Sequence, residues 1–217
     1  KYQIEFPICF LNIGGISNIT KIIKKDENLE RNLEAFDSGP GNCMIDNWIR
    51  KNSKNYFDKN GSIAKSGKID QLILNQAIDN FKIDSFEHSL DLKDFDISFA
   101  RGLTLEDGCA TITNFTAYLI AKGVEYANGN NNKPIKYLIC GGGRKNSFLI
   151  QNIKDYLLHK KNIKLNSIDD YNLNGDYIES QAFGYLAIRS FLKLPISYPK
   201  TTGCMMPTVG GKLVKNF

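Results

Sequence analysis

The chain has 217 residues, of which 42% are hydrophobic and 24% charged, and its formal net charge is +5. This length suits one large domain or two small ones with a sizeable core, and the composition is that of an ordinary globular protein. Because the lysines are scattered, no basic arm for nucleic acid is indicated. We see no signal peptide and no apolar run near the ~18 residues of a membrane helix, so we expect neither secretion nor membrane insertion.

The cysteines are odd in number, far apart and without a C-x-x-C pair. They are Cys9, Cys43, Cys109, Cys140 and Cys204. This pattern argues against a disulfide framework or a zinc site and favours a reducing compartment. The two histidines, His88 and His159, give little support to a Ser-His-Asp or Cys-His mechanism.

The first part of the chain predicts three short strands. Apolar runs cover Pro7–Ile13, Ile16–Ile23 and Leu33–Phe36. The pair Gly14-Gly15 between the first two predicts a hairpin, and Asp26–Asn32 predicts a polar turn. We therefore expect a three-strand meander that ends at an aspartate, Asp37.

Helices are predicted next. Met44–Arg50 is a short helix, Asn52–Lys68 is expected to be a loop, and Ile69–Asn80 has a helical period with Ile69, Leu72, Ile73, Ala77 and Phe81 on one face. Lys82–Leu103 has no clear period and either covers a site or connects two elements. Thr104, with Asp107 three residues later, predicts the start of a helix that continues to about Ala127.

The last part of the chain alternates strands and helices. The strand Tyr137–Cys140 leads into a glycine-rich loop and a helix that ends near Lys160. A strand at Ile163–Leu165, a helix at Ile178–Leu192 and a loop-like tail follow. The order β-β-β, helices, β-α-β-α predicts an α/β domain of the ribonuclease-H-like type, with helical insertions. Actin, Hsp70 and the sugar kinases use this arrangement twice, with ATP between the copies, and one copy is visible here.

The stretch Asp37–Asn42 (Asp-Ser-Gly-Pro-Gly-Asn) places a carboxylate between a strand and a predicted helix. The carboxylate is an acceptor and a candidate base, and the N–H groups of a helix start attract anions. Gly39 and Gly41 let a ligand approach the backbone. The alternative is a tight turn in which Asp37 only caps the helix.

Two further glycine sites follow strands in the same way. Gly14 and Gly15 follow the first strand, and Gly141, Gly142 and Gly143 follow the fourth. Ligands of α/β sheets lie beyond the carboxyl ends of strands, and glycine removes the side chain that would block a phosphate. A run of glycines is also typical of an ordinary strand-to-helix turn, and no Walker loop is present.

Other carboxylates are candidates with simpler explanations. Glu179 begins the last large helix, where an acidic residue complements the helix dipole. Asp46 suits a helix surface, and Asp107 suits a cap. A carboxylate cluster on this fold is also how a two-metal nuclease works, so a nuclease stays an alternative.

Five segments together resemble the anhydro-N-acetylmuramic acid kinase family. They are Leu11–Thr20, Asp37–Asn42, Asp107–Thr111, Cys140–Asn146 and Glu179–Phe183, followed by Thr202-Gly203. They occur in the family's order from one end of the chain to the other.

The resemblance implies a bacterial cytoplasmic enzyme of cell-wall recycling. It implies that ATP and water open the anhydro ring while O6 is phosphorylated, which gives N-acetylmuramic acid 6-phosphate and ADP. Asp37 is then the base toward water. The glycines of the three loops and Asn146 would face the nucleotide, while Glu179 and Asn42 would contact the sugar. The partners would be ATP, Mg²⁺ and a small sugar. Neither nucleic acid nor a membrane is expected, and a homodimer stays an open alternative.

The departures from the family pattern concern its first half. The family begins with a lobe that holds a Gly-Thr-Ser-x-Asp-Gly loop, and this chain has no such loop. Residues 1–217 therefore resemble a single C-terminal lobe, with the Mg²⁺ ligands in the absent lobe or supplied by phosphates. We expect this chain to be inactive by itself. Ser38 replaces the usual threonine, and His88–Asp91 replaces a Lys-Ser segment. Besides the nuclease, a non-catalytic ATP-binding domain of the actin or Hsp70 type stays an alternative.

Overall fold

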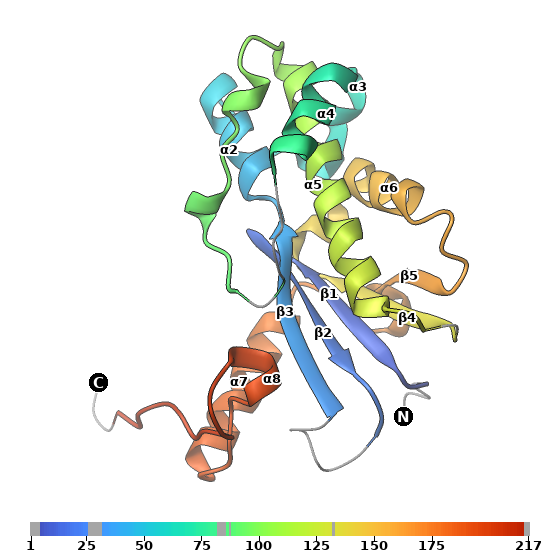
Figure 1. Ribbon diagram of the computed structural model, residues 1–217. Coiled ribbons are helices and arrows are strands. Elements are labelled where there is room, and N and C mark those ends of the chain that lie inside the picture. Colours follow the sequence, from blue (N-terminus) through green and yellow to red (C-terminus); the bar gives the residue numbers. More distant parts are fainter. Residues whose placement is uncertain (1–4, 26–31, 82–85, 87, 132, 215–217) are drawn as a thin grey trace.

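The computed structural model describes residues 5–25, 32–81, 86, 88–131 and 133–214 (Figure 1). Within these residues a five-stranded sheet has the order β3-β2-β1-β4-β5. The strands are β1 Ile8–Ile13, β2 Ile16–Ile22, β3 Leu33–Pro40, β4 Ile135–Cys140 and β5 Ile163–Ser167. The predicted strands and the Gly14-Gly15 hairpin are confirmed.

The strand directions place four carboxyl ends at one edge of the sheet. β2 is antiparallel to β1 and β3, whereas β4 is parallel to β1 and β5 is parallel to β4. This meander followed by parallel βα units is the predicted ribonuclease-H-like arrangement, and the fold class is confirmed. The segments that follow β1, β3, β4 and β5 therefore start from a common edge.

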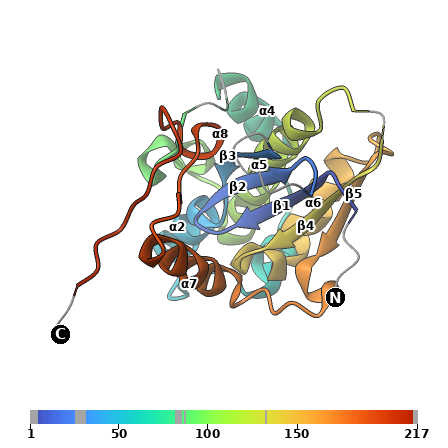
Figure 2. The same cartoon turned by 90° about the horizontal axis from the view of Figure 1, so that it is seen from below.

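The described helices are α2 Cys43–Asn52, α3 Ser62–Ser66, α4 Gln71–Asn80, α5 Leu105–Asn128, α6 Ser147–Tyr156, α7 Ile178–Phe191 and α8 Pro199–Thr202. Short 3₁₀ turns are η1 Lys59–Gly61, η2 Leu92–Asp94, η3 Ser98–Ala100, η4 Gly142–Lys145 and η5 Ile168–Tyr171. Helices α2, α3 and α4 gather beyond the carboxyl end of β3, while α7 and α8 lie toward its other end (Figure 1). Figure 2, seen from below, shows the C-terminal tail extending away from the sheet.

Helix α5 is the centre of the core. The Thr104 hydroxyl accepts the N–H of Asp107 at 3.1 Å, which confirms the predicted cap. The helix is buried on nearly all sides because it packs on β2 and β3 and is covered by α2, α3, α4 and α6. It therefore supports the strand that carries Asp37.

Three details of the prediction were wrong. The expected loop Asn52–Lys68 contains η1 and α3, because buried Asp58 accepts the N–H groups of Ile63 and Ala64 and so starts a helix. The helix after the glycine loop ends at Tyr156 instead of Lys160, and Leu72 is 70% exposed instead of buried.

Other predicted segments fall partly outside the described residues. The turn Asp26–Asn32 lies outside them except for Asn32. Residues 82–85 and 87 of the stretch Lys82–Leu103 also lie outside them, while η2 and η3 form the rest.

Candidate active site

Asp37 lies within β3, because the strand continues to Pro40. Its Oδ2 atom accepts the N–H of Leu90 at 2.8 Å, so the interpretation of Asp37 as a helix cap is wrong. The N-cap of α2 is Asn42. The sequence suggested a turn because glycine and proline follow Asp37, but both residues fit an irregular strand end. Asp37 thus presents a half-buried carboxylate from the surface of a sheet.

A β-bulge interrupts the pairing of β2 with β3 next to Asp37. Asn18 pairs with Asp37 and Ser17 pairs with Gly39, so Ser38 is the extra residue. Ser38 and Ser17 are fully buried and their hydroxyl oxygens lie 2.9 Å apart. Gly39 adopts a φ of 137°, which other residues rarely adopt. The bulge therefore fixes the backbone immediately after Asp37 inside the protein.

A cavity of about 930 Å³ opens beside Asp37. Its described lining comes from β2, β3, the end of α5, the residues Phe86, His88 and Ser89, and α8 with Gly203 after it. The cavity joins Asp37 to the Thr202-Gly203 motif, although 165 positions separate Asp37 from Thr202 in the sequence (202 − 37). It is large enough for a small-molecule substrate.

The walls of this cavity carry both aromatic and charged groups. The ring of Phe36 lies 5.1 Å from that of Tyr126 and 5.4 Å from that of Phe86, measured between centroids. Lys21 donates to the carbonyl of Ala127 at 2.8 Å. The aromatic rings offer an apolar face to a ligand, and the charged rim offers hydrogen-bond partners. No periodicity in the sequence indicated this wall, because its residues come from separate elements.

The first two glycine sites are bonded to each other. The N–H of Gly41 donates to the carbonyl of Gly15 at 2.9 Å, and that of Asn42 donates to the carbonyl of Gly14 at 2.7 Å. The N–H of Cys43 also donates to Gly15, at 3.1 Å. These N–H groups at the start of α2 thus already donate to acceptors within the protein. The expectation that they would bind an anion is therefore wrong for these three N–H groups.

Close packing explains several of the predicted glycines. A Cβ atom on Gly41 would lie 2.2 Å from the carbonyl oxygen of Gly14, and one on Gly143 would lie 2.2 Å from Cγ2 of Ile13. Gly39 packs on Leu119 of α5, where a Cβ would lie 3.1 Å from its Cβ. These three glycines allow backbone segments to approach one another.

Gly141 packs closely as well, since a Cβ atom on it would lie 2.4 Å from Oδ1 of Asn12, whereas Gly142 is open. Gly141 has a φ of 78°, and Gly142 is exposed, with only the Asn42 side-chain nitrogen near its Cβ position, at 3.9 Å. Gly15 is also exposed. The three loops thus meet at the carboxyl edge of the sheet, and Gly142 is the loop position most open to a ligand.

The two predicted asparagines have hydrogen bonds within the protein. Asn146 is buried, and its Oδ1 accepts the N–H of Leu149 at 3.0 Å as the N-cap of α6. The Asn42 amide donates to the carbonyl of Gly14 at 3.1 Å. Gly142 and Gly143 lie in the 3₁₀ turn η4, and α6 begins only at Ser147, so the glycines do not form the first turn of this helix.

Glu179 is exposed in the first turn of α7. It lies near enough to the end of β4 to affect Cys140. Burial raises the pKa of the Cys140 thiol to about 11, Arg144 opposes this and the negative charge of Glu179 adds to it. Glu179 therefore belongs with the glycine-loop edge of the sheet.

The segment from His88 to Leu92 contacts both Asp37 and the glycine loop after β1. Leu90 bonds Asp37 through its N–H, and Leu92 Cδ2 lies 3.8 Å from the Cβ position of Gly15. Of the two interpretations of this stretch, the structure supports the one in which it covers the site. Its sequence has no period, so only its position in the fold reveals this.

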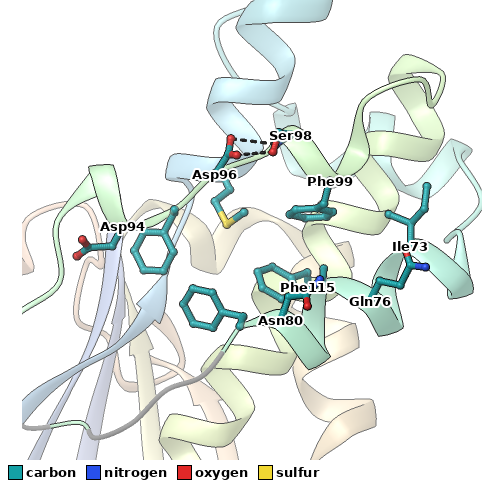
Figure 3. A pocket seen from close by; sticks show the side chains of 12 residues that line it. Ile73, Gln76, Asn80, Asp94, Asp96, Ser98, Phe99 and Phe115 are labelled. Carbon is teal, nitrogen blue, oxygen red and sulfur yellow. Dashed lines mark hydrogen bonds between the residues drawn. The ribbon is translucent and has the colours of Figure 1, made fainter.

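A second cavity, of about 410 Å³, lies between α2, α4, α5 and the loop that carries η3. Phe99 and Phe115 line it beside Ile73, and Asn80 and Gln76 lie at its edge (Figure 3). Its described lining contains none of the predicted site residues. Across the described part of the chain, no group of three His, Cys, Asp or Glu residues is arranged to hold a metal ion, and no described helix is long and apolar enough to cross a membrane.

Thiol reactivity tests the packing beside the site. We expect iodoacetamide at pH 8 to label Cys204 in the native protein well before Cys9 and Cys140. Burial raises the pKa of both buried thiols to about 11, which leaves about one thiolate in a thousand at that pH. Mass spectrometry of timed digests measures the order. Equal labelling of Cys140 and Cys204 in the folded protein would contradict the described burial.

Comparison with known proteins identifies the family. A family model described as anhydro-N-acetylmuramic acid kinase matches residues 4–216. The chain belongs to this family. The kinase of this name from Pelagibacter ubique is 50% identical over 99% of this chain and 57% of its own length, and that from Zymomonas mobilis is 38% identical over 97% and 55%. The chain thus spans a little over half the length of these relatives.

Part of the chain is also similar to a solved structure. The activator of 2-hydroxyisocaproyl-CoA dehydratase from Clostridium difficile, with bound ADPNP, matches with a TM-score of 0.42 and 16% identity. The match covers 76% of this chain and 56% of that chain.

Proposed function

We propose that this chain is one lobe of an anhydro-N-acetylmuramic acid kinase and that it carries the catalytic base, Asp37. The complete enzyme would convert the 1,6-anhydro sugar, ATP and water into N-acetylmuramic acid 6-phosphate and ADP in the cytoplasm. Membership of the family and the length of the relatives support this role. The observation that carries it is the position of Asp37, at the wall of a cavity and beside the edge where three glycine loops meet.

The hydrogen bonds of Asp37 suit a base. Within the described residues only Oδ2 accepts a hydrogen bond, from the Leu90 N–H, which orients the carboxylate. The other oxygen can then accept a proton from a water molecule. This water attacks the anomeric carbon, the bond from that carbon to O6 breaks, and O6 takes the transferred phosphoryl group. The proton stays on Asp37 until product release.

The nucleotide would lie at the glycine-loop edge. Gly142 and Gly15 are exposed there, and Gly141 gives the loop its conformation. The other predicted residues pack or form hydrogen bonds inside the protein and so support the loops; they are Gly39, Gly41, Gly143 and Asn146. Glu179 and Asn42 lie at the same edge, where we propose that Glu179 contacts the sugar side.

Among the described residues, no group of three His, Cys, Asp or Glu side chains is arranged to form a metal site made of protein alone. Mg²⁺ would come with the triphosphate, which is its usual partner in kinases. We therefore assign no step to a metal ligand of this chain.

Activity of the complete protein and of residues 1–217 alone tests the proposal. We expect the complete gene product to release ADP only when both ATP and the anhydro sugar are present. Residues 1–217 alone are expected to release none above background, because the cleft needs a second lobe. A coupled ADP assay measures both, with the already hydrolysed sugar as a control substrate. Sugar-dependent ADP release by the isolated chain would contradict the single-lobe role, and its absence from the complete protein would contradict the function.

A further inference from the structure

Arg144 is a buried cation directly after the glycine loop. Only 5% of its side chain is exposed. Its guanidinium donates to the carbonyl of Gly141 at 3.0 Å and to the Asp169 carboxylate at 2.8 Å, and it forms an ion pair with Asp176 at 3.0 Å. One side chain therefore connects three separate segments.

These three segments start at the predicted nucleotide edge. Gly141 follows β4, Asp169 lies in η5 directly after β5, and Asp176 lies two residues before the start of α7, which carries Glu179 in its first turn. Arg144 thus fixes the glycine loop relative to the helix that carries the candidate sugar contact.

The guanidinium of Arg144 is tightly packed. Asp169 also accepts the N–H of Gly175 at 2.9 Å, and a Cβ atom on Gly175 would lie 2.3 Å from Nε of Arg144. The hydrogen bond from Arg144, with that from Gly175, lowers the pKa of Asp169 to about 2. The carboxylate is therefore ionised at any physiological pH and keeps its bond to Arg144.

We propose that Arg144 is a positioning residue that holds the Gly141–Gly143 loop and the first turn of α7 in the geometry needed to bind the nucleotide. This inference rests on the proposed function. Arginine suits the role because its planar fork donates in several directions at once, whereas a lysine ammonium is a compact point charge. Lys145, the next residue, pairs with Asp176 at 2.8 Å from the solvent side, whereas the bond to the Gly141 carbonyl comes from Arg144.

Arg144→Gln in the complete protein tests the proposal, with Lys145→Gln as the matched control and Arg144→Lys as the conservative variant. Hydrogen exchange of the peptide around 141–146 is expected to speed up in Arg144→Gln and stay unchanged in Lys145→Gln. We expect the KM for ATP to rise about tenfold or more, since bonds to a charged group are lost. The KM for the sugar is expected to rise by a clearly smaller factor, because only one candidate sugar contact, Glu179, lies on the first turn of α7. Arg144→Lys is expected to recover part of the effect.

The exchange result and the kinetics are read together. An unchanged loop, or equal increases in both KM values that follow the loss of overall stability, would overturn the positioning role. If Arg144→Gln does not fold, Asp169→Asn gives the same comparison, because its side chain is half exposed. A wild-type protein without kinase activity would refute the proposed function, and the exchange result would still decide whether Arg144 holds the loop.

Discussion

Replacement of Asp37 by asparagine is expected to lower kcat of the complete kinase by about 10²–10⁴-fold, the usual contribution of a general base. Asparagine keeps the shape and can still accept the Leu90 N–H, which lies 2.8 Å from Oδ2 in the wild-type structure. It cannot take a proton from water. We therefore expect the affinity for ATP and the thermal midpoint to stay close to their wild-type values. Steady-state kinetics and nucleotide binding by calorimetry measure both.

Asp46→Asn is the matched control for this experiment. Asp46 is a half-buried carboxylate in the first turn of α2, nine residues after Asp37 (46 − 37). Its loss is expected to change kcat less than about twofold, as for other substitutions away from the reacting atoms. Unchanged turnover in Asp37→Asn would reject the base and favour a non-catalytic ATP-binding domain. Equal loss in both variants would indicate a structural effect.

Gly41→Ala is expected to destabilise the protein by about 3 kcal/mol, at the upper end for added atoms in a packed site. The new Cβ would lie 2.2 Å from the carbonyl oxygen of Gly14, and this neighbour is backbone, so the hairpin itself would have to move. The hydrogen bond from the Gly41 N–H to the Gly15 carbonyl would be strained as well. Urea unfolding of the purified protein measures the change.

Gly142→Ala separates packing from ligand binding. Its Cβ would meet no atom closer than 3.9 Å, so the stability is expected to change by less than about 0.5 kcal/mol. If the loop faces the nucleotide, the same variant raises the KM for ATP. Similar losses of stability in Gly41→Ala and Gly142→Ala would contradict the described packing of the loops.

Periodicity and turn residues predicted most of the fold. The apolar runs predicted each of the five strands that the structure describes, and Thr104 located the start of α5 correctly. The prediction failed where one buried side chain decides the local structure. Asp58 bonds two N–H groups of the segment expected to be a loop and starts α3, and nothing in the adjacent sequence shows that Asp58 is buried.

The candidate site was predicted only in part, for a similar reason. The spacing in the sequence identified Asp37 and the glycine loops, because the carboxyl ends of parallel strands share an edge. It could not separate a glycine that packs, such as Gly41 or Gly143, from one that is open, such as Gly142, because the difference lies in contacts between distant segments. The hydrogen bond from Leu90 to Asp37 and the bonds of Arg144 also join segments that are distant in the sequence.

The central claim is that Asp37 directs water to the sugar while ATP phosphorylates it. The most direct test is turnover by the complete protein in ¹⁸O-labelled water, with immediate borohydride reduction of the product to prevent exchange. The account predicts one ¹⁸O atom at the former anomeric carbon and none in the phosphoryl group. Label in released inorganic phosphate, with the anhydro ring intact, would contradict it.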